Sequence, residues 1–297
     1  MSEVKDEGAL DNYLTKRAEW FSWYDVTSAE PNSLQSQLFL MLLSEMSYRV
    51  LREERDVQTG DAFAIPIVAH LLDSGYFSSQ VLAVRRLLDK RPDVISLRRL
   101  LDDIKRHRHL LTREIYVSFD QTPYDAGPLQ SEIEELQMPE SPFSGNMRSR
   151  QRHERFDRLS ETSASNRSRF DRVHPNMFTK LESWLDTSGA SRLVTASHKY
   201  LAHAAQQVTI KNAPSDLSFS EVEAIQKVIV QVLRVIFDLI LVNAYSEVVP
   251  MTPSGFFGQV WDGNNQIPAT ERMNQHWNRM AEERNQWVHN LDDDFFT

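Results

Sequence analysis

Apolar residues recur at spacings of three and four along most of this chain, and no segment shows the strict alternation that is typical of a β-strand. Residues three or four apart share one face of a helix, so the pattern favours helices that each bury one face. Hydrophobic residues make up 41% of the sequence, which is enough to build a core. The chain is therefore predicted to be all-α, a bundle in which sequential helices lie antiparallel.

Proline, glycine and polar clusters divide this pattern into segments. Gly75 is expected to break one helical stretch into two. Ser218 and Glu221, three residues apart before a long apolar run, match a capping box and are expected to begin the longest helix. The predicted helices cover 10–24, 34–56, 61–72, 78–89, 96–119, 175–185, 190–208, 219–247 and 269–290.

The segment 120–174 differs from the rest because prolines and glycines punctuate it and an arginine-rich stretch follows. Between Met147 and Arg172 there are eight arginines and four acids. We expect a long irregular insertion with one helix near 150–160. The composition of the arginine-rich stretch 147–172 buries little apolar surface, so this stretch is expected to be mobile or to lie against a second chain, outside the core. Three interpretations stay open: a surface loop, an arm that embraces a second subunit, and an RNA-backbone contact through Arg148, Arg150, Arg152 and Arg155.

Composition excludes several kinds of site. The chain has no cysteine, which excludes disulfides, thiol catalysis and cysteine metal sites. His107 and His109 are two residues apart and would point in different directions from a helix, and no other metal-ligand spacing is present. No P-loop or dinucleotide fingerprint occurs. We therefore expect neither a metal nor a cofactor.

Charge and hydropathy suggest where the protein works. The net charge of -9 argues against a protein that coats nucleic acid, although a local basic patch remains compatible with it. The acidic N-terminus lacks the features of a signal peptide. The most apolar run, 228–242, contains Arg234 and Asp238 and is better explained as a buried helix than as a membrane span. A soluble, cytoplasmic protein without a membrane partner is expected.

The stretch 195–205, TASHKYLAHAA, concentrates basic residues on one predicted helix. At 100° per residue, Arg192, Lys199 and His203 fall within about 40° of one another, opposite the apolar face that includes Leu193. His198 lies between the two faces. The stripe is explained either as the solvated side of a structural helix or as a site that handles phosphate, because histidine moves protons near neutral pH and cations neutralise phosphate.

A family resemblance bears on this choice. The segment VRRLLDKRPDVISLRRLLDDI (84–104), the helix with HKYLAHA and the long apolar helix after it resemble the HEPN superfamily, closest to its AbiU-type branch, which is associated with bacterial abortive infection by phage. The resemblance spans about 34–248. It implies an N-terminal helical arm over 1–30, a HEPN-like helical domain over 31–249 with the insertion 120–174, and a C-terminal helical appendix with an acidic tail over 250–297.

Members of this superfamily are helical bundles that usually dimerise, and the resemblance implies a homodimer here. Many are metal-independent RNases with the pattern Arg-Asn/Asp-Lys-x-x-Ala-His, placed at the dimer interface. Lys199 and His203 match the lysine and the histidine of that pattern, and His198 occupies the Asn/Asp position. Ser197 stands where the pattern has arginine. Serine cannot hold a phosphate as a guanidinium does, so either Arg192 and Lys199 substitute for it or the site is inactive.

A second match to the spacing occurs near the C-terminus, where Arg284 is followed by Asn and, five residues on, by His289. Two functions therefore stay open. One is a HEPN-like protein of the phage-defence or toxin type that is degenerate and acts as a helical scaffold or as a module that binds RNA or a protein partner. The other is a metal-independent endoribonuclease that promotes 2′-hydroxyl attack on single-stranded RNA, with His203 as general acid/base and Lys199 with Arg192 as the phosphate clamp.

Overall fold

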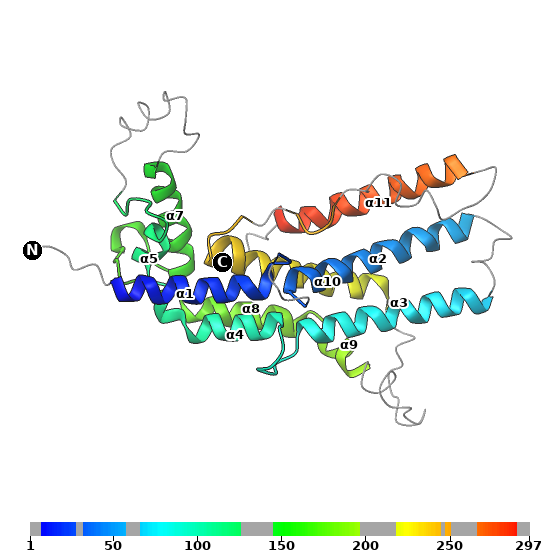
Figure 1. Cartoon of the computed structure of the whole chain (residues 1–297), viewed down its shortest axis with the longest axis horizontal. Helices are drawn as coiled ribbons and strands as arrows, with labels where there is room; N and C mark the ends of the chain where they lie inside the picture. Colours follow the sequence, from blue (N-terminus) through cyan, green and yellow to red (C-terminus); the bar gives the residue numbers. More distant parts are fainter. Residues whose placement is uncertain are drawn as a thin grey trace, which may run out of the picture.

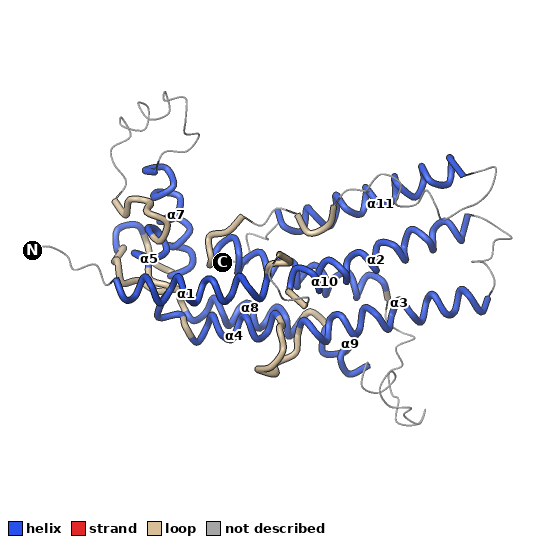
Figure 2. The backbone as a smooth tube through the Cα atoms, viewed as in Figure 1, coloured by secondary structure: helices blue, strands red, loops and turns tan. Residues whose placement is uncertain are grey.

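The computed structural model describes residues 7–27, 32–57, 66–125, 145–196, 218–244, 247–250 and 266–289. Their regular elements are helices, and no strand occurs among them (Figure 2). The all-α prediction is confirmed. The longer α-helices are α1 (Glu7–Tyr24), α2 (Leu34–Val57), α3 (Pro66–Leu87), α7 (Gly145–Ser160), α8 (Pro175–Thr187), α10 (Phe219–Arg234) and α11 (Gln266–His289). The shorter ones are α4 (Leu97–Arg106), α5 (Arg113–Ser118) and α9 (Ala190–Ala196), with 3₁₀ turns at Arg108–Leu110 and Ala164–Asn166.

The helices form an elongated bundle in which α2 and α3 make an antiparallel hairpin (Figure 1). Helix α11 packs on α2 and α10, α8 packs on α10 and α4, and α9 packs on α3. Helices α5 and α7 pack together at the opposite end of the molecule from the tip of the hairpin. One connected cluster of buried apolar side chains runs through these elements. Such a cluster is what a bundle of one-sided helices produces.

Helix α10 begins where the sequence predicts. The Ser218 hydroxyl accepts a hydrogen bond from the Glu221 amide at 3.2 Å, and the Glu221 carboxylate accepts one from the Ser218 amide at 2.8 Å. These two bonds form the predicted capping box and satisfy amides that the first turn of a helix leaves unpaired. The hydrogen bond from the Ser218 amide lowers the pKa of the Glu221 carboxyl.

Two predicted helix boundaries are wrong. Helix α3 runs without a break through Gly75, because Tyr76, Gln80 and Val84 bury one side of it and this packing outweighs the cost of about 1 kcal/mol for a helical glycine. Conversely, the single helix expected over 96–119 is interrupted between α4 and α5. The Thr112 hydroxyl caps a new helix there, and the bend lets its neighbour Arg113 enter the interior.

The helix expected over 219–247 is shorter than predicted. After α10 the chain forms a π-helical turn at Val235–Ile240, and Val242 with φ of 52° ends the regular structure. Buried residues occur around most of its circumference, because α2, α8 and α11 belong to the same core as α10. Side chains of the same chain therefore cover the apolar sides of this helix.

The arginine-rich segment contains the expected helix as α7, but the prediction that it stays outside the core is wrong. Phe156 and Leu159 of α7 are fully buried in the main cluster. The segment can be ordered despite its few apolar residues because acids of the same region pair with its arginines, as for Arg152 with Asp120. None of the helices in the described part of the chain combines the length and the apolar composition that a membrane span requires.

Candidate functional site

The structure describes only the residues that precede the predicted site in the sequence. Ser197, His198, Lys199 and His203 lie outside the described residues. The preceding helix α9 contains Arg192 and Leu193, and the structure buries Leu193 completely while it leaves Arg192 exposed. The start of the motif helix therefore has the orientation that the helical wheel predicts, with the basic side turned away from the core.

Arg192 forms an ion pair with a residue in the first turn of α10. Its Nη1 lies 2.5 Å from Oε1 of Glu221, the capping-box residue, and the two side chains are 48% and 39% exposed. An ion pair with this exposure contributes about 1 kcal/mol or less, so an anion of higher charge could displace the carboxylate. In the described structure, however, the guanidinium is engaged within the chain.

A small basic cavity borders the same helix. It has a volume of about 320 Å³ and lies between the C-terminal end of α3 and α9, with Arg85, Arg91 and Val194 in its lining. Asp89 forms part of this lining and pairs with Arg91 at 3.0 Å. The arrangement supplies cations next to the motif but, among the lining residues described, no histidine that could move a proton.

The second candidate, Arg284 with His289 on α11, does not form one site. Arg284 is wholly buried, and its Nη2 donates to Glu45 at 3.2 Å and lies 3.3 Å from Glu223. Its guanidinium also packs on the ring of Trp287, 4.7 Å from the centroid. His289 is exposed. The structure places the cation in the core and the histidine on the surface, so the two do not face a common substrate.

Glu45 is a residue that the sequence analysis missed. It lies on α2 within an otherwise apolar stretch, fully buried, between Arg49 and Arg284. Burial raises the pKa of its carboxyl, against the opposite influence of the two guanidinium groups. A carboxylate that interrupts an apolar helical face is the only signal in the sequence that could have pointed to it.

The four arginines considered for RNA contact do not share one environment. Arg148 is exposed, and Arg150 lines a cavity of about 510 Å³ together with Tyr124 and His153. Arg152 is buried and makes a bidentate contact of 2.7 Å with Asp120. Arg155 lies 3.5 Å from Asp238 near the end of the α10 segment. They therefore do not present a single cationic face.

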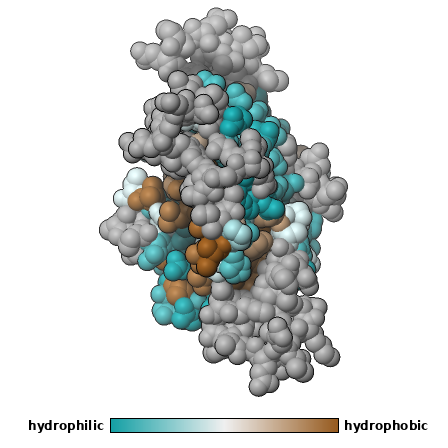
Figure 3. All heavy atoms as spheres, turned by 90° about the vertical axis from the view of Figure 1, so that its right-hand side faces the viewer, coloured by the Kyte–Doolittle hydropathy of each residue, from teal (hydrophilic) through white to brown (hydrophobic). Residues whose placement is uncertain are grey.

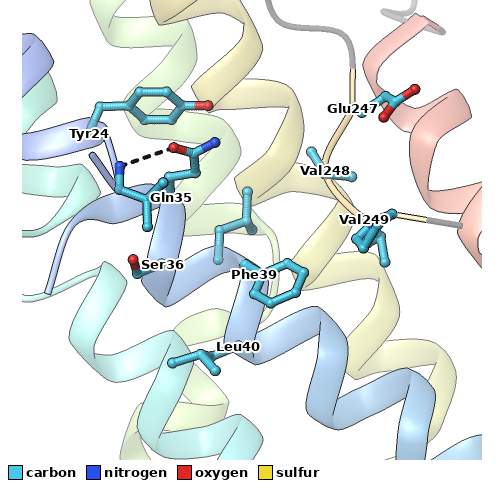
Figure 4. Close-up of a pocket in the computed structure, with 11 residues that line it drawn as sticks. Tyr24, Gln35, Ser36, Phe39, Leu40, Glu247, Val248 and Val249 are labelled. Carbon is cyan, nitrogen blue, oxygen red and sulfur yellow. Dashed lines mark hydrogen bonds between the residues drawn. The ribbon is translucent and has the colours of Figure 1, made fainter. Parts of the chain in front are cut away.

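A larger cavity of about 560 Å³ lies between the turn after α1, the first half of α2 and the stretch 247–250 (Figure 4). The side chain of Gln35 accepts a hydrogen bond from the Val26 amide at 3.1 Å at its edge. Leu38, Phe39 and several other apolar residues line the cavity, and Glu247 is the only aspartate, glutamate, lysine or arginine in the described lining. Such a lining suits an apolar group and not a phosphate.

Among the described residues, no three histidine, aspartate or glutamate side chains are grouped so that they could hold a metal ion. Comparisons with known proteins add the family. The model of the family HEPN_AbiU2, described as AbiU2, matches residues 34–251, which is more than half of the chain and begins at the first residue of α2. No curated protein and no solved structure gives a significant match. The chain therefore belongs to the AbiU2 family of HEPN proteins, a family of the abortive-infection type.

Proposed function

We propose that this protein serves abortive phage defence as a HEPN-type helical module that acts by binding and not by cleaving RNA. The proposal begins with Ser197, which occupies the position of the arginine in the HEPN pattern. A hydroxyl offers one donor and no charge, whereas a guanidinium offers five donors and a permanent charge to a phosphate. A replacement cation would have to come from elsewhere in the chain.

The observation that carries the proposal is that both replacement arginines already pair with carboxylates of their own chain. Arg284 is wholly buried against Glu45, so it cannot reach RNA without unfolding α11. Arg192 is bound to Glu221, which the capping box fixes in turn. On the helix that the sequence predicts over 190–208, Arg192 precedes His203 by eleven residues, about 16 Å, which is too far for both to serve one phosphate of the same subunit.

The test is an RNase assay of the full chain on end-labelled single-stranded RNA in the presence of a chelator. The proposal expects no cleavage by the wild type and no change on His203→Ala. Cleavage that His203→Ala abolishes while His70→Ala, at an exposed histidine on α3, leaves it intact would overturn the proposal. Binding of RNA by the inactive wild type, measured by fluorescence anisotropy, would separate an RNA-binding module from a scaffold for proteins.

One observation favours the alternative function, a metal-independent endoribonuclease. Arg192 is exposed on α9 and its ion pair is a weak one, so Lys199 and an Arg192 from a second subunit could clamp a phosphate beside His203. Ser197→Arg tests how much of the catalytic arrangement is left. The endoribonuclease hypothesis expects this change to raise cleavage above wild type, and Ser191→Arg on α9 provides the matched control, because it adds the same charge outside the motif.

A further inference from the structure

Two cavities adjoin between the turn after α1, the start of α2 and the stretch 247–250. The apolar one, shown in Figure 4, has a volume of about 560 Å³, and the second has a volume of about 330 Å³. Tyr24, Gln35 and Glu247 line both of them, so one ligand can occupy the two together. We call them the apolar chamber and the polar chamber. Pockets that hold small molecules in proteins measure about 300–1,000 Å³.

The apolar chamber combines buried and exposed apolar side chains. Leu38 and Val249 are 3% and 1% exposed, whereas Val26 and Leu40 are 55% and 60% exposed. In Figure 4, Phe39 of α2 lies beside the valines of the stretch 247–250. Apolar surface in a concave lining gains free energy when an apolar group replaces the water there. The chamber therefore suits the apolar body of a ligand.

Exposed apolar side chains at the other end of α2 and α3 provide a comparison. Ile67 and Leu71, in the first turns of α3, are 67% and 63% exposed. Figure 3 faces the end of the molecule where α3 begins and shows hydrophobic residues interspersed with polar ones. Single apolar side chains on a protein surface are common and indicate no site by themselves. Val26 and Leu40 differ because both border one cavity.

Helix α11 holds the wall formed by the stretch 247–250 in place. The Asn285 side chain accepts hydrogen bonds from the amides of Val248 and Val249 at 2.9 and 3.2 Å. It also donates one to the Val249 carbonyl oxygen at 2.9 Å, and the Trp277 indole donates one to the Pro250 carbonyl oxygen at 3.2 Å. A wall that is ordered before a ligand arrives lowers the entropic cost of binding.

The charged residues in the described linings are acidic. Glu247 lines both chambers, Asp25 lines the polar one, and neither described lining contains a lysine or an arginine. Asp25 is held in position because its carboxylate accepts a hydrogen bond from the Thr27 amide at 2.8 Å. Two carboxylates beside an apolar chamber attract a cation and repel an anion. The ring of Tyr24, which lines both chambers, also favours a cation.

Positive groups near the chambers are already engaged. Arg17 packs on the ring of Phe21, 4.4 Å from its centroid, and donates to the Leu241 carbonyl oxygen at 3.1 Å, and it belongs to neither described lining. The N-terminal end of α2 carries a partial positive charge, but the Ser33 hydroxyl accepts a hydrogen bond from the Ser36 amide there at 3.2 Å. The carboxylates therefore determine the sign of charge that the chambers select.

We infer that the two chambers together bind a small molecule with an apolar body and one cationic group, an amphipathic amine, whether or not the protein binds RNA. The apolar body covers Leu38 and Val249, and the ammonium group lies beside the Glu247 carboxylate. An anion of the same shape meets two carboxylates and is rejected. Two concave chambers of this size fit a small molecule better than the flat surface of a protein partner.

The test is a fluorescence titration of the full chain with two probes of similar body and opposite charge, naphthylethylamine and naphthylacetate. We expect the amine to bind about 10-fold more tightly than the acetate. Glu247→Gln combined with Asp25→Asn should abolish this preference, and asparagine can keep the hydrogen bond from the Thr27 amide. Absence of saturable amine binding, equal affinity for the two probes, or a preference that survives in the double variant would overturn the inference.

Lysine substitutions locate the site. Val26→Lys places a cation at the apolar chamber and should weaken amine binding about 5-fold, whereas Ile67→Lys, at a similarly exposed position on α3, should leave it unchanged. Circular dichroism checks that each variant is folded. Equal effects of the two lysines would place the amine elsewhere and overturn the inference. An amine affinity that falls as the protein concentration rises would show that a second copy fills the chambers, which also contradicts the inference.

Discussion

Two arginines in the described part of the chain are completely buried, and their surroundings differ. Arg113, between α5 and α7, donates from Nε to Asp171 at 2.9 Å, from Nη1 to Asp157 at 2.8 Å and from Nη2 to Ser160 at 3.2 Å. Arg284, on α11, donates from Nη2 to Glu45, but its Nε and Nη1 donate no hydrogen bond to the described residues, and Nη1 has only an ion-pair contact with Glu283 at 3.1 Å. Each nitrogen of the Arg113 guanidinium therefore donates a hydrogen bond, whereas only one nitrogen of the Arg284 guanidinium does.

This difference shows that the two buried arginines have different structural roles. Around Arg113, acids from the arginine-rich segment itself complete the network, so a segment with few apolar residues becomes part of the core. Around Arg284, the apolar side chains of α11, such as Trp277 and Met280, already attach the helix, and the ion pair adds an expensive buried charge. The first arginine organises its region, while the second is tolerated in a region that packing holds together.

The largest effect is expected for Arg113→Met. Removal of this cation leaves Asp157, Asp171 and Ser160 without their shared donor, and we expect a loss of about 4 kcal/mol in the free energy of unfolding. Urea denaturation followed by circular dichroism measures it. Arg148→Met, at an exposed arginine on α7, is the control and should cost less than about 0.5 kcal/mol. An Arg113→Met variant as stable as this control would show that apolar packing alone holds α7.

Arg284→Met is expected to cost about 3 kcal/mol, because Glu45 then remains buried with Arg49 as its main cation. The double variant Glu45→Met with Arg284→Met tests whether the ion pair or the packing attaches α11. Replacement of a poorly matched buried pair by apolar groups of similar size is often neutral, so the double variant should lie within about 1 kcal/mol of wild type. Equal losses in the single and double variants would mean that the ion pair, and not packing, attaches α11.

Acidification should change the stability contributed by the two regions in opposite directions. The hydrogen bonds from Arg152 lower the pKa of Asp120, so this group stabilises the fold above its unfolded pKa of about 4, and the stabilisation is lost as the pH falls. Burial raises the pKa of Glu45, so its contribution is present at low pH and is lost as the pH rises. Asp120→Asn should therefore remove about 1 kcal/mol of the stability that wild type loses between about pH 5 and pH 2, a modest amount because the carboxyl is partly exposed.

The measurement is urea denaturation across that pH range, with Asp11→Asn on the exposed side of α1 as the control. The control should follow the wild-type curve. If Asp120→Asn loses as much stability on acidification as wild type does, the carboxylate is not the group that couples the arginine-rich region to pH.

The sequence predicted elements whose signals are local. The helix over 34–56, the capping box at Ser218 and the burial of Leu193 follow from periodicity and from side chains within one turn, and the structure confirms them. The expected break at Gly75 and the continuous helix over 96–119 were wrong, because packing between distant segments decides both. For the candidate site, Ser197 could be recognised from the motif alone. The burial of Arg284 could not, since its partner Glu45 lies 239 residues away.

The smallest effect is expected where the same carboxylate meets a more exposed arginine. Asp157 binds Arg113, which is fully buried, and also Arg167, whose side chain is 29% exposed and contacts both carboxylate oxygens, the nearer at 2.6 Å. Arg167→Met should cost only about 0.5 kcal/mol, because water screens this pair and solvates the carboxylate once the guanidinium is gone. Urea denaturation beside Arg113→Met compares two partners of one carboxylate. If both variants lose the same stability, the number of hydrogen bonds and not the burial of the cation determines what Asp157 contributes, and the distinction between the two buried arginines would have to rest on hydrogen bonding alone.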